Sequence, residues 1–398
     1  MATANPIPEI TSASARPDPC LLVLLATMPQ EQLESVLANL AAAFPAEDML
    51  IAAPEALPAD MYPTFRIVAA PATKPSWTLT AADFVNAHHL AQKNNASGIL
   101  VLGAESGSLG LSALRNLASA VMGTPTDLAV PSYDLPPHAG LLNSAIFYPL
   151  SRALFASRAR FPMAIDLGLS LRMAERLSKA AQRFIALHQG DAPLWPVSEA
   201  AVAGFAINEF DAGPRVLPQP AEPDLNTILP IVTGSLFSDI DAKAAFWQRA
   251  RQLPPARNAI PVAQAHLTDA SADIASMIQT FRLAYTNLQE IWSLVLPPNT
   301  LLGLKRLSVT DAAVFRMPET LWARIVFDFL LAYRLRTINR KHLLGALIPL
   351  YLAWVASHIH ITASGTNPER HIEAVAAAFE VEKPYLVSRW RWPDRFNP

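Results

Sequence analysis

The sequence predicts an α/β fold: a mostly parallel sheet with helices on both faces, followed by an all-helical C-terminal region. Two observations predict it. In the first half of the chain, short runs of apolar residues alternate with segments of helical periodicity. From residue 238 onward, apolar residues recur at helical spacing only. We therefore expect an α/β domain at residues 19–237, a helical domain at residues 238–398 and a disordered tail at residues 1–18.

Five segments of the α/β domain have the short, apolar character of buried parallel strands. They lie at residues 20–26, 49–53, 65–69, 99–102 and 128–131. Helical patterns stand between them at residues 32–43, 84–94 and 112–121. Ligands of such sheets bind in the crevice at the carboxyl ends of the strands. This rule places Thr27, Ala53, residues 103–107 and residues 132–134 around one crevice.

The C-terminal half shows five further helical patterns and a proline-rich link at residues 253–261. The helical patterns lie at residues 238–247, 271–296, 319–336, 341–357 and 369–379. The third pattern places Leu321, Ile325, Phe329 and Tyr333 on one apolar face. We expect this face to be available for a homodimer contact.

Composition excludes several classes of protein. The chain has 398 residues, of which 52% are hydrophobic, and a net charge of −2, so no basic excess indicates nucleic-acid binding. The single cysteine, Cys20, excludes an intrachain disulfide and favours a reducing, cytoplasmic location. The longest apolar run, residues 343–355, is shorter than the ~20 residues of a membrane span. Three basic residues precede it, which leaves a membrane-surface helix open beside a buried core helix.

Residues 140–172 carry the strongest chemical signal, GLLNSAIFYPLSRALFASRARFPMAIDLGLSLR. Asn143 and Ser144 stand at the mouth of a predicted helix, where unpaired backbone N–H groups and the helix dipole favour an anionic group. Asp166 stands between two apolar residues, Ile165 and Leu167, and a carboxylate in such surroundings is costly unless it binds something. One end of the segment therefore suits an acid or a phosphate, and the other a hydroxyl group or a cation.

This segment resembles the nucleotide-sugar glycosyltransferases of the mannosylglycerate and glucosyl-3-phosphoglycerate synthase type. Those proteins carry a similar Asn-Ser-x-x-x-Tyr-Pro-Leu-x-Arg-Ala-Leu run, and then a Pro-x-small-small-Asp-x-Gly-x-Ser run. The likeness continues at residues 194–237, 322–354 and 379–386, in the same order along the chain. The resemblance implies a GT-A-like, Rossmann-like sheet domain with a helical C-terminal domain. It also implies sugar transfer from a nucleotide-sugar to a small hydroxy-acid-type acceptor.

The resemblance also assigns roles to individual residues. It implies acceptor binding by the segment that precedes and opens the predicted helix, at Leu142, Asn143, Ser144, Tyr148 and Arg152. It implies that Asp166 contacts the sugar hydroxyls, orients the acceptor or acts as a base. It implies that Thr27, Glu105 and Arg215 bind the nucleotide-sugar donor. Ordinary structural readings stay open: a helix cap at Asn143 and Ser144, packing of Tyr148 and Arg152, and an ion pair of Asp166 with Arg160 or Arg172.

The chain departs from the family at the positions that hold a divalent ion. Two carboxylates usually follow the fourth strand, but here Gly103-Ala104-Glu105 provides only Glu105. The family's further metal-binding histidine follows a motif matched by residues 213–216, and Leu217 stands in its place. Binding of Mg²⁺ or Mn²⁺ through Glu105 is therefore doubtful.

Three functions remain open from the sequence. The first is a working transferase for a nucleotide-sugar and a small acceptor. The second is a catalytically impaired relative that binds a nucleotide or a sugar acid as a regulatory subunit. The third is a structural partner that dimerises through its helical domain. No integral membrane segment and no nucleic-acid partner are expected with any of them.

Overall fold

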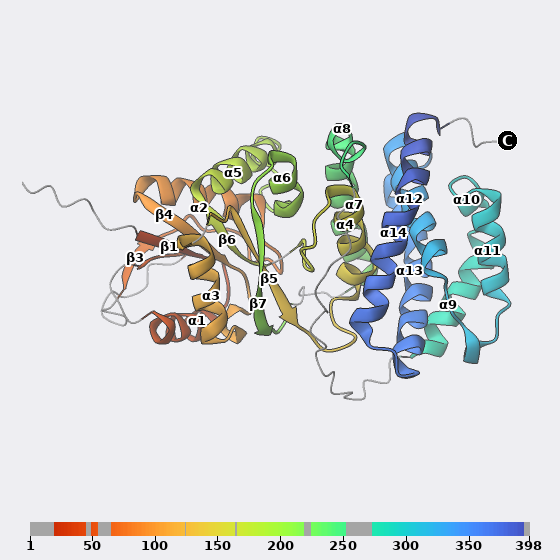
Figure 1. The fold of residues 1–398 in the computed structure, drawn as a ribbon, viewed down its shortest axis with the longest axis horizontal. Helices are drawn as coiled ribbons and strands as arrows, with labels where there is room; N and C mark the ends of the chain where they lie inside the picture. The colour runs from red at the N-terminus through yellow and green to blue at the C-terminus, as the bar shows by residue number, and fades with distance from the viewer. Residues whose placement is uncertain are drawn as a thin grey trace, which may run out of the picture.

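The computed structural model describes residues 20–44, 49–54, 65–123, 125–163, 165–218, 224–251 and 273–393. The predicted tail at residues 1–18 and the predicted link at residues 253–261 lie outside these ranges. Figure 1 shows two units side by side, a sheet covered by helices and a helical bundle.

The N-terminal unit is built on a seven-stranded sheet in the order β3-β2-β1-β4-β6-β5-β7. Its strands are β1 (Cys20–Leu25), β2 (Met49–Ala53), β3 (Arg66–Ala69), β4 (Ala96–Leu102), β5 (Leu128–Asp134), β6 (Asp166–Ser170) and β7 (Ile207–Pro214). All neighbouring pairs are parallel except those of β6, which runs antiparallel to both β4 and β5. The prediction of a mostly parallel sheet is confirmed, and β6 and β7 are strands that the sequence patterns did not reveal.

Helices cover both faces of the sheet, as predicted (Figure 1). The helices of this unit are α1 (Gln30–Ala43), α2 (Ala81–Lys93), α3 (Leu111–Met122), α5 (Leu171–Ile185) and α6 (Pro196–Ala203), with the short turn η1 (Ser106–Ser108). Alternate residues of β1 enter opposite cores because side chains of a strand alternate in direction. Leu22 and Leu24 pack with α2, α5 and α6, whereas Leu21 and Val23 pack with α1 and α3.

A glycine allows α3 to lie close to the antiparallel strand. A Cβ atom at Gly168 of β6 would stand 2.3 Å from Cγ2 of Val121 and 3.0 Å from Cδ1 of Leu117. Any larger residue would therefore push α3 away from the centre of the sheet.

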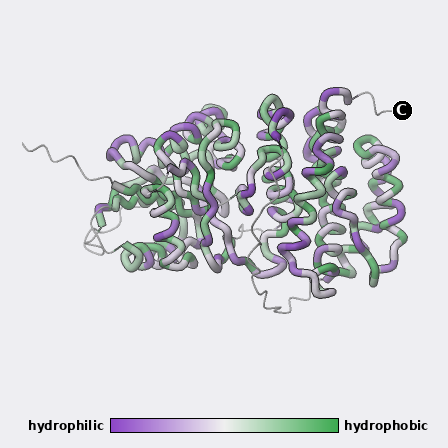
Figure 2. Tube along the Cα trace, viewed as in Figure 1, coloured by the Kyte–Doolittle hydropathy of each residue, from purple (hydrophilic) through white to green (hydrophobic). Residues whose placement is uncertain are grey.

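The C-terminal unit is a helical bundle with its own apolar core. Its helices are α7 (Leu225–Ala242), α8 (Ala244–Trp247), α9 (Ile274–Asn287), α10 (Gln289–Ser293), α11 (Pro298–Ser308), α12 (Glu319–Leu335), α13 (Arg340–Ala363) and α14 (Pro368–Arg391), with the turn η3 (Ala312–Val314). Figure 2 shows the apolar stretches of these helices among more polar ones. The predicted boundary after residue 237 falls inside α7, which continues unbroken to Ala242.

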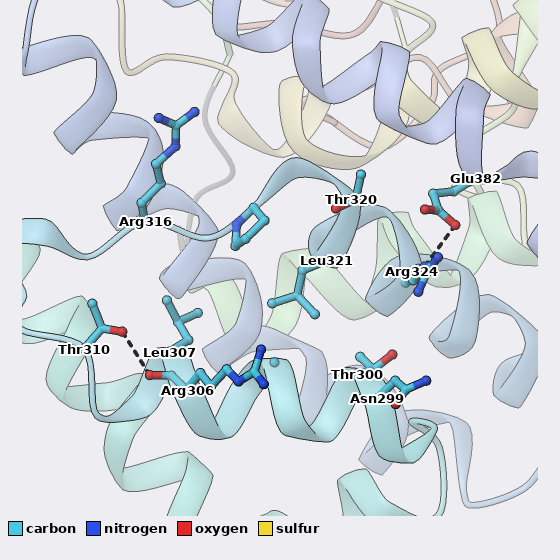
Figure 3. Close-up of a pocket in the computed structure, with 12 residues that line it drawn as sticks. Asn299, Thr300, Arg306, Leu307, Thr310, Arg316, Thr320, Leu321, Arg324 and Glu382 are labelled. Carbon is cyan, nitrogen blue, oxygen red and sulfur yellow. Dashed lines mark hydrogen bonds and ion pairs between the residues drawn. The ribbon is translucent and has the colours of Figure 1, made fainter.

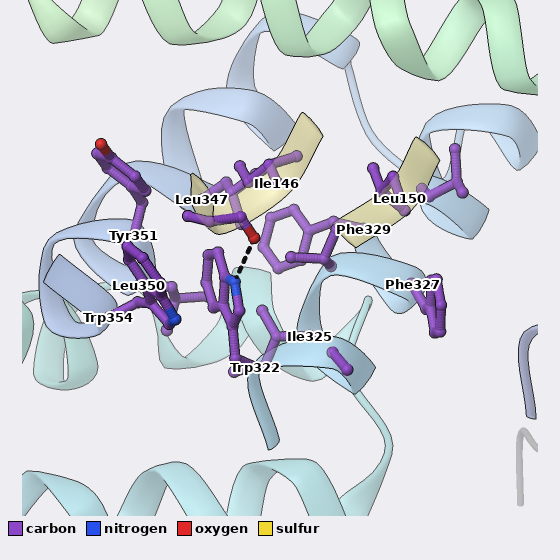
Figure 4. Close-up of a cluster of buried hydrophobic side chains, with 14 of the residues drawn as sticks. Ile146, Leu150, Trp322, Ile325, Phe327, Phe329, Leu347, Leu350, Tyr351 and Trp354 are labelled. Carbon is purple, nitrogen blue, oxygen red and sulfur yellow. Dashed lines mark hydrogen bonds between the residues drawn. The ribbon is translucent and has the colours of Figure 1, made fainter. Parts of the chain in front are cut away.

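A segment of the sheet unit is inserted into this bundle. The π-helical turn η2 (Asn143–Phe147) and α4 (Tyr148–Phe155) leave the sheet between β5 and β6. Their residues Ile146 and Leu150 are fully buried in the bundle core (Figure 4). The indole Nε1 of Trp322 donates to the carbonyl of Ala145 at 2.8 Å. The acceptor-type segment is therefore held by the C-terminal unit.

The prediction that one face of α12 is available for a homodimer contact is wrong for three of the four residues of that face. Ile325 and Phe329 are 0% exposed and Tyr333 is buried, all within the chain's own core. Helix α12 uses this face to pack inside the bundle, so it is not available to a second copy.

Helix α13 is the one described helix that is long and apolar enough to cross a membrane. Of its most apolar stretch of 18 residues, 78% is buried inside the fold. That burial favours the reading of residues 343–355 as part of a core helix.

Candidate functional site

A buried ion pair stands at the carboxyl ends of the central strands. The side chains of Asp166 and Arg215 are 1% and 0% exposed, and Nε of Arg215 lies 2.9 Å from Oδ2 of Asp166. Nη2 of Arg215 donates to Oδ1 at 3.3 Å. The hydroxyl of Tyr133 donates to Oδ2 at 2.9 Å, and the backbone N–H of Gly103 to Oδ1 at 3.2 Å. Four donors therefore satisfy the carboxylate, from β5 and from the residues that directly follow β4 and β7.

The remaining N–H groups of Arg215 fasten the loop after β4. They donate to the carbonyl oxygens of Ala104 (2.7 Å) and Glu105, to the hydroxyl of Ser108 (2.9 Å) and to the carbonyl of Val216 (2.7 Å). Burial opposes the charge of this guanidinium, but the Asp166 carboxylate raises the pKa of Arg215 above its usual value. The residue expected to face a diphosphate is thus a fixed internal cation that binds protein oxygens.

Either of two arginines was expected as the ion-pair partner of Asp166, and both expectations are wrong. Arg172 lies at the start of α5 and pairs with Asp127. Arg160 pairs with Glu369 of α14. The observed partner, Arg215, comes instead from the end of β7.

The side chain of Glu105 is held by Gln32. Its backbone lies in the left-handed region with φ of 59°, and its N–H donates to Oε1 of Gln32 at 3.2 Å. The Gln32 side-chain amide donates back to the Glu105 carboxylate. Among the described residues, no group of three or more histidine, cysteine, aspartate or glutamate side chains is placed to hold a metal ion.

Thr27 follows β1, the strand next to β4 in the sheet. Its hydroxyl is 2.9 Å from the hydroxyl of Thr73, which in turn lies 3.3 Å from Oδ1 of Asp83. Burial raises the pKa of Asp83. Thr27 is therefore part of a polar chain at the crevice edge.

The acceptor-type residues Asn143 and Ser144 meet at Arg160. Nη2 of Arg160 donates to the hydroxyl of Ser144 at 2.9 Å, and the Asn143 amide donates to the carbonyl of Arg160 at 2.9 Å. Nε and Nη2 of Arg160 bind the two oxygens of Glu369, each at 2.9 Å. From the sequence, Arg160 was considered only as an ion-pair partner of Asp166. Its position between α4 and β6 was the one signal that it could belong to a site.

Two buried atoms of this cluster have no hydrogen-bond partner within the described part of the chain. They are Nη1 of Arg160 and Oδ1 of Asn143. A donor and an acceptor that are both buried and unpaired are costly in a folded protein. An unpaired donor and an unpaired acceptor in the same cluster are what a site offers when a ligand supplies the missing hydrogen-bond partners.

Tyr148 and Arg152 lie one helical turn apart and face α14. The hydroxyl of Tyr148 and a guanidinium nitrogen of Arg152 both donate to the Glu373 carboxylate. Nη2 of Arg152 lies 3.0 Å from Glu380. Burial and the neighbouring Glu373 carboxylate raise the pKa of Tyr148. Leu142 is partly buried against the bundle core, so these three predicted acceptor residues join the two units.

A further carboxylate that the sequence did not indicate lies on the same side. Oε2 of Glu209, in β7, accepts from the backbone N–H of Arg160 at 2.9 Å. The residue is exposed at the surface, but partial desolvation of its carboxylate by neighbouring groups raises the pKa of Glu209, and the nearby Glu369 adds to this effect. Edge-strand glutamates are usually solvated, which is why the sequence gave no signal.

Comparison with known proteins gives matches to solved structures only. No sequence profile of a protein family matches the chain, and no curated protein matches it. A solved structure of glucosyl-3-phosphoglycerate synthase from Mycobacterium tuberculosis with phosphoglyceric acid is 11% identical, with a TM-score of 0.35, and the match covers 56% of this chain and 79% of that chain. The same enzyme with Mn²⁺, UDP-glucose and phosphoglyceric acid is 11% identical, with a TM-score of 0.37 and the same coverage. A structure described only as a mycobacterial protein is 12% identical over 56% of this chain and 74% of that chain, with a TM-score of 0.35.

The first two structures are glycosyltransferases of the type that residues 140–172 resemble. Since the TM-scores and identities are low, the function proposed below depends on the sequence motifs and on the geometry of the site.

Proposed function

We propose that the protein is a glycosyltransferase-like protein that binds a nucleotide-sugar in the strand-end crevice and transfers the sugar to a small acceptor with a carboxylate or phosphate group. The observation that carries this proposal is the pair of unpartnered buried atoms at Arg160 and Asn143, beside the Ser144 hydroxyl.

Arg160 has the chemistry of an acceptor-anion site. A planar guanidinium binds a carboxylate or phosphate through two parallel hydrogen bonds, as Arg160 already binds Glu369. An acceptor anion at the unpaired Nη1 satisfies the buried donor, and an anion in the place of Glu369 binds Nε and Nη2. The Oδ1 atom of Asn143 then accepts a hydrogen bond from an acceptor hydroxyl group.

The residues of the crevice do not fit a divalent ion. Glu105 has its carboxylate bound by Gln32, and Asp166 is already neutralised by Arg215. A divalent ion that took Asp166 as a ligand would leave the buried charge of Arg215 uncompensated. We therefore propose transfer without a resident metal, with Asp166 as a positioning residue that fixes Arg215 and the strand ends.

A second candidate function is supported by the same ion pair. Because Asp166 and Arg215 direct their polar atoms at each other and at the backbone, neither is free to act on a sugar or a diphosphate. This favours a protein that binds a sugar donor or an acid without turnover.

A transfer assay separates the two functions. UDP-glucose and GDP-mannose are each incubated with glycerate or 3-phosphoglycerate, with Mn²⁺ or with EDTA, and products are detected by mass spectrometry. Product in EDTA supports the metal-independent transferase. Nucleotide-sugar binding without product, measured by calorimetry, supports the second function, and product only with Mn²⁺ contradicts the proposed absence of a metal role.

The acceptor role of Arg160 has its own test. We expect Arg160→Ala to raise KM for the acceptor at least about tenfold, since a charge-assisted pair is lost, with a smaller change in kcat. Arg160→Lys restores part of the affinity. Arg183→Ala, an exposed arginine on α5, is the matched control and leaves KM unchanged.

A further inference from the structure

A groove in the C-terminal unit is unrelated to the crevice. It encloses about 410 Å³ between α11 and α12, with one wall from α14 (Figure 3). The resembled C-terminal stretches, residues 322–354 and 379–386, contribute Arg324 and Glu382 to it. The function proposed above does not use either residue.

The lining of the groove is positively charged. Arg306, Arg316 and Arg324 line it, and Glu382 is its only acidic lining residue. Nε of Arg324 lies 2.9 Å from a carboxylate oxygen of Glu382, so this pair is internally balanced. Arg316 pairs with Glu319 at 3.1 Å and points away from Arg306 in Figure 3.

Arg306 is the unbalanced charge of the groove. It is exposed, and its guanidinium has no hydrogen bond or ion pair with any residue that the structure describes. In Figure 3 its side chain runs along α11 and ends below Leu321. An anion that enters the groove therefore meets a free guanidinium at its mouth.

Neutral polar groups and a small apolar surface complete the groove. Asn299 and Thr300 come from the first turn of α11, and Thr300 is only 4% exposed. Leu321 supplies the apolar part, and a Cβ atom at Gly303 would stand 2.9 Å from its Cδ1. The absence of a side chain at residue 303 thus keeps α11 and α12 close while the groove stays open.

We propose that this groove binds a small organic anion that carries hydroxyl groups, either a phosphate ester or a carboxylate. Arg306 binds the anionic group. The Arg324–Glu382 pair and the Thr300 hydroxyl bind the hydroxyl groups, because together they present both donors and acceptors.

Calorimetric titration of the full chain tests the proposal. The probes are glycerol 3-phosphate as a phosphate ester, glycerate as a hydroxy carboxylate and glycerol as the neutral polyol. We expect Arg306→Glu to weaken binding of the anionic probe roughly 10- to 100-fold, in line with the loss of one charge-assisted pair and the added repulsion. Lys305→Glu changes the charge equally at the preceding exposed position, outside the groove lining, and we expect less than about twofold weakening.

Two further variants make the outcome unambiguous. Leu321→Trp fills the groove and is expected to abolish the same binding event with the thermal unfolding transition retained. Because the same anions are proposed to bind at Arg160, the titrations are repeated in the Arg160→Ala background, which removes that event and is expected to leave binding in the groove intact. The phosphate ester and the carboxylate are distinguished by their relative affinities. Absence of binding of every anionic probe, equal effects of Arg306→Glu and Lys305→Glu, or loss of binding in the groove in Arg160→Ala overturns the proposal.

Discussion

The proposed donor side and the proposed acceptor side of the site differ in how completely their buried charges and polar atoms are paired. On the donor side, Asp166 and Arg215 neutralise each other within one unit, and the Asp166 oxygens receive four donors. On the acceptor side, Arg160 obtains its carboxylate from Glu369 of the other unit and still leaves a buried N–H unpaired. A closed network stabilises the strand ends, whereas an incomplete one has capacity for a ligand.

The largest expected effect concerns the closed network. Arg215→Ala leaves the Asp166 carboxylate buried without its counter-ion and removes the donors to the loop after β4. We expect the free energy of unfolding to fall by about 3–5 kcal/mol, the usual cost of breaking a buried pair from one side. Urea unfolding followed by circular dichroism measures it.

The control for this prediction is Arg183→Ala, which removes an exposed arginine of α5 and is expected to change stability by less than about 0.5 kcal/mol. If Arg215→Ala instead kept wild-type stability and lost only nucleotide-sugar affinity, Arg215 would be a ligand-binding residue. The contrast between the two sides of the crevice would then disappear.

The second prediction uses pH and the histidines behind the acceptor side. The Nδ1 atoms of His358 and His371 lie 2.7 Å apart, and His358 is 0% exposed. Burial, with further repulsion from His371, His138 and Arg160, lowers the pKa of His358 from its ordinary 6.5 to about 3. Burial also lowers the pKa of His371, which faces Glu319 at 3.7 Å.

A lowered pKa in the folded state means that the unfolded chain binds more protons as the pH falls. The stability due to neutral His358 is therefore complete above pH 6.5 and is lost progressively toward pH 3. We expect a loss of about 2 kcal/mol between about pH 7.5 and pH 5 from this residue. His358→Gln flattens the slope, and His342→Gln, exposed on the same helix, does not. An equal slope in wild type and His358→Gln would show that other groups dominate.

The fold was predictable where the signal is local. Strands β1 to β5 were expected because each is a short apolar run. The run is buried at residues 21–25 of β1, throughout β2 and at nearly all of β4. Strand β6 was missed because it has only five residues and begins and ends with a polar one. No apolar run marks β7, because it lies at the sheet edge and is largely exposed. Only the family resemblance over residues 194–237 indicated a strand there.

The candidate site was predictable only in part, for a different reason. The burial of Asp166 followed from its apolar neighbours, but its partner Arg215 is 49 residues away in the chain. Glu369 is 209 residues from Arg160. Such pairs depend on the tertiary fold, because local spacing along a helix or strand does not specify them.

The third prediction concerns the carboxylate of Glu369, which pairs with Arg160 on the proposed acceptor side. Glu369→Gln removes the charge that occupies Arg160 and a favourable acid in the first turn of α14. Since Glu369 is 38% exposed, we expect a stability loss of only about 0.5–1 kcal/mol. Affinity for glycerate, measured by calorimetry, should rise because Arg160 no longer has a competing carboxylate.

The matched control is Glu290→Gln, an exposed first-turn acid of α10 with no ion pair among the described residues. It should leave glycerate affinity unchanged. If Glu369→Gln weakened glycerate binding as much as Arg160→Ala, Glu369 would have to contact the ligand, and it would not compete with glycerate for Arg160.

The smallest expected effect is at Glu105, the one remaining acid of the family's metal motif. In Glu105→Gln the oxygen that accepts from Gln32 is kept, and the backbone N–H still donates to Gln32. We expect less than about 0.5 kcal/mol loss of stability, and the same response to Mn²⁺ in the presence of UDP-glucose as in wild type. Glu31→Gln, an exposed acid on the neighbouring helix α1, is the control for the lost charge. Loss of a Mn²⁺-dependent heat in Glu105→Gln alone would mean that Gln32 releases the carboxylate to a metal, and that the donor side, like the acceptor side, has capacity for a ligand.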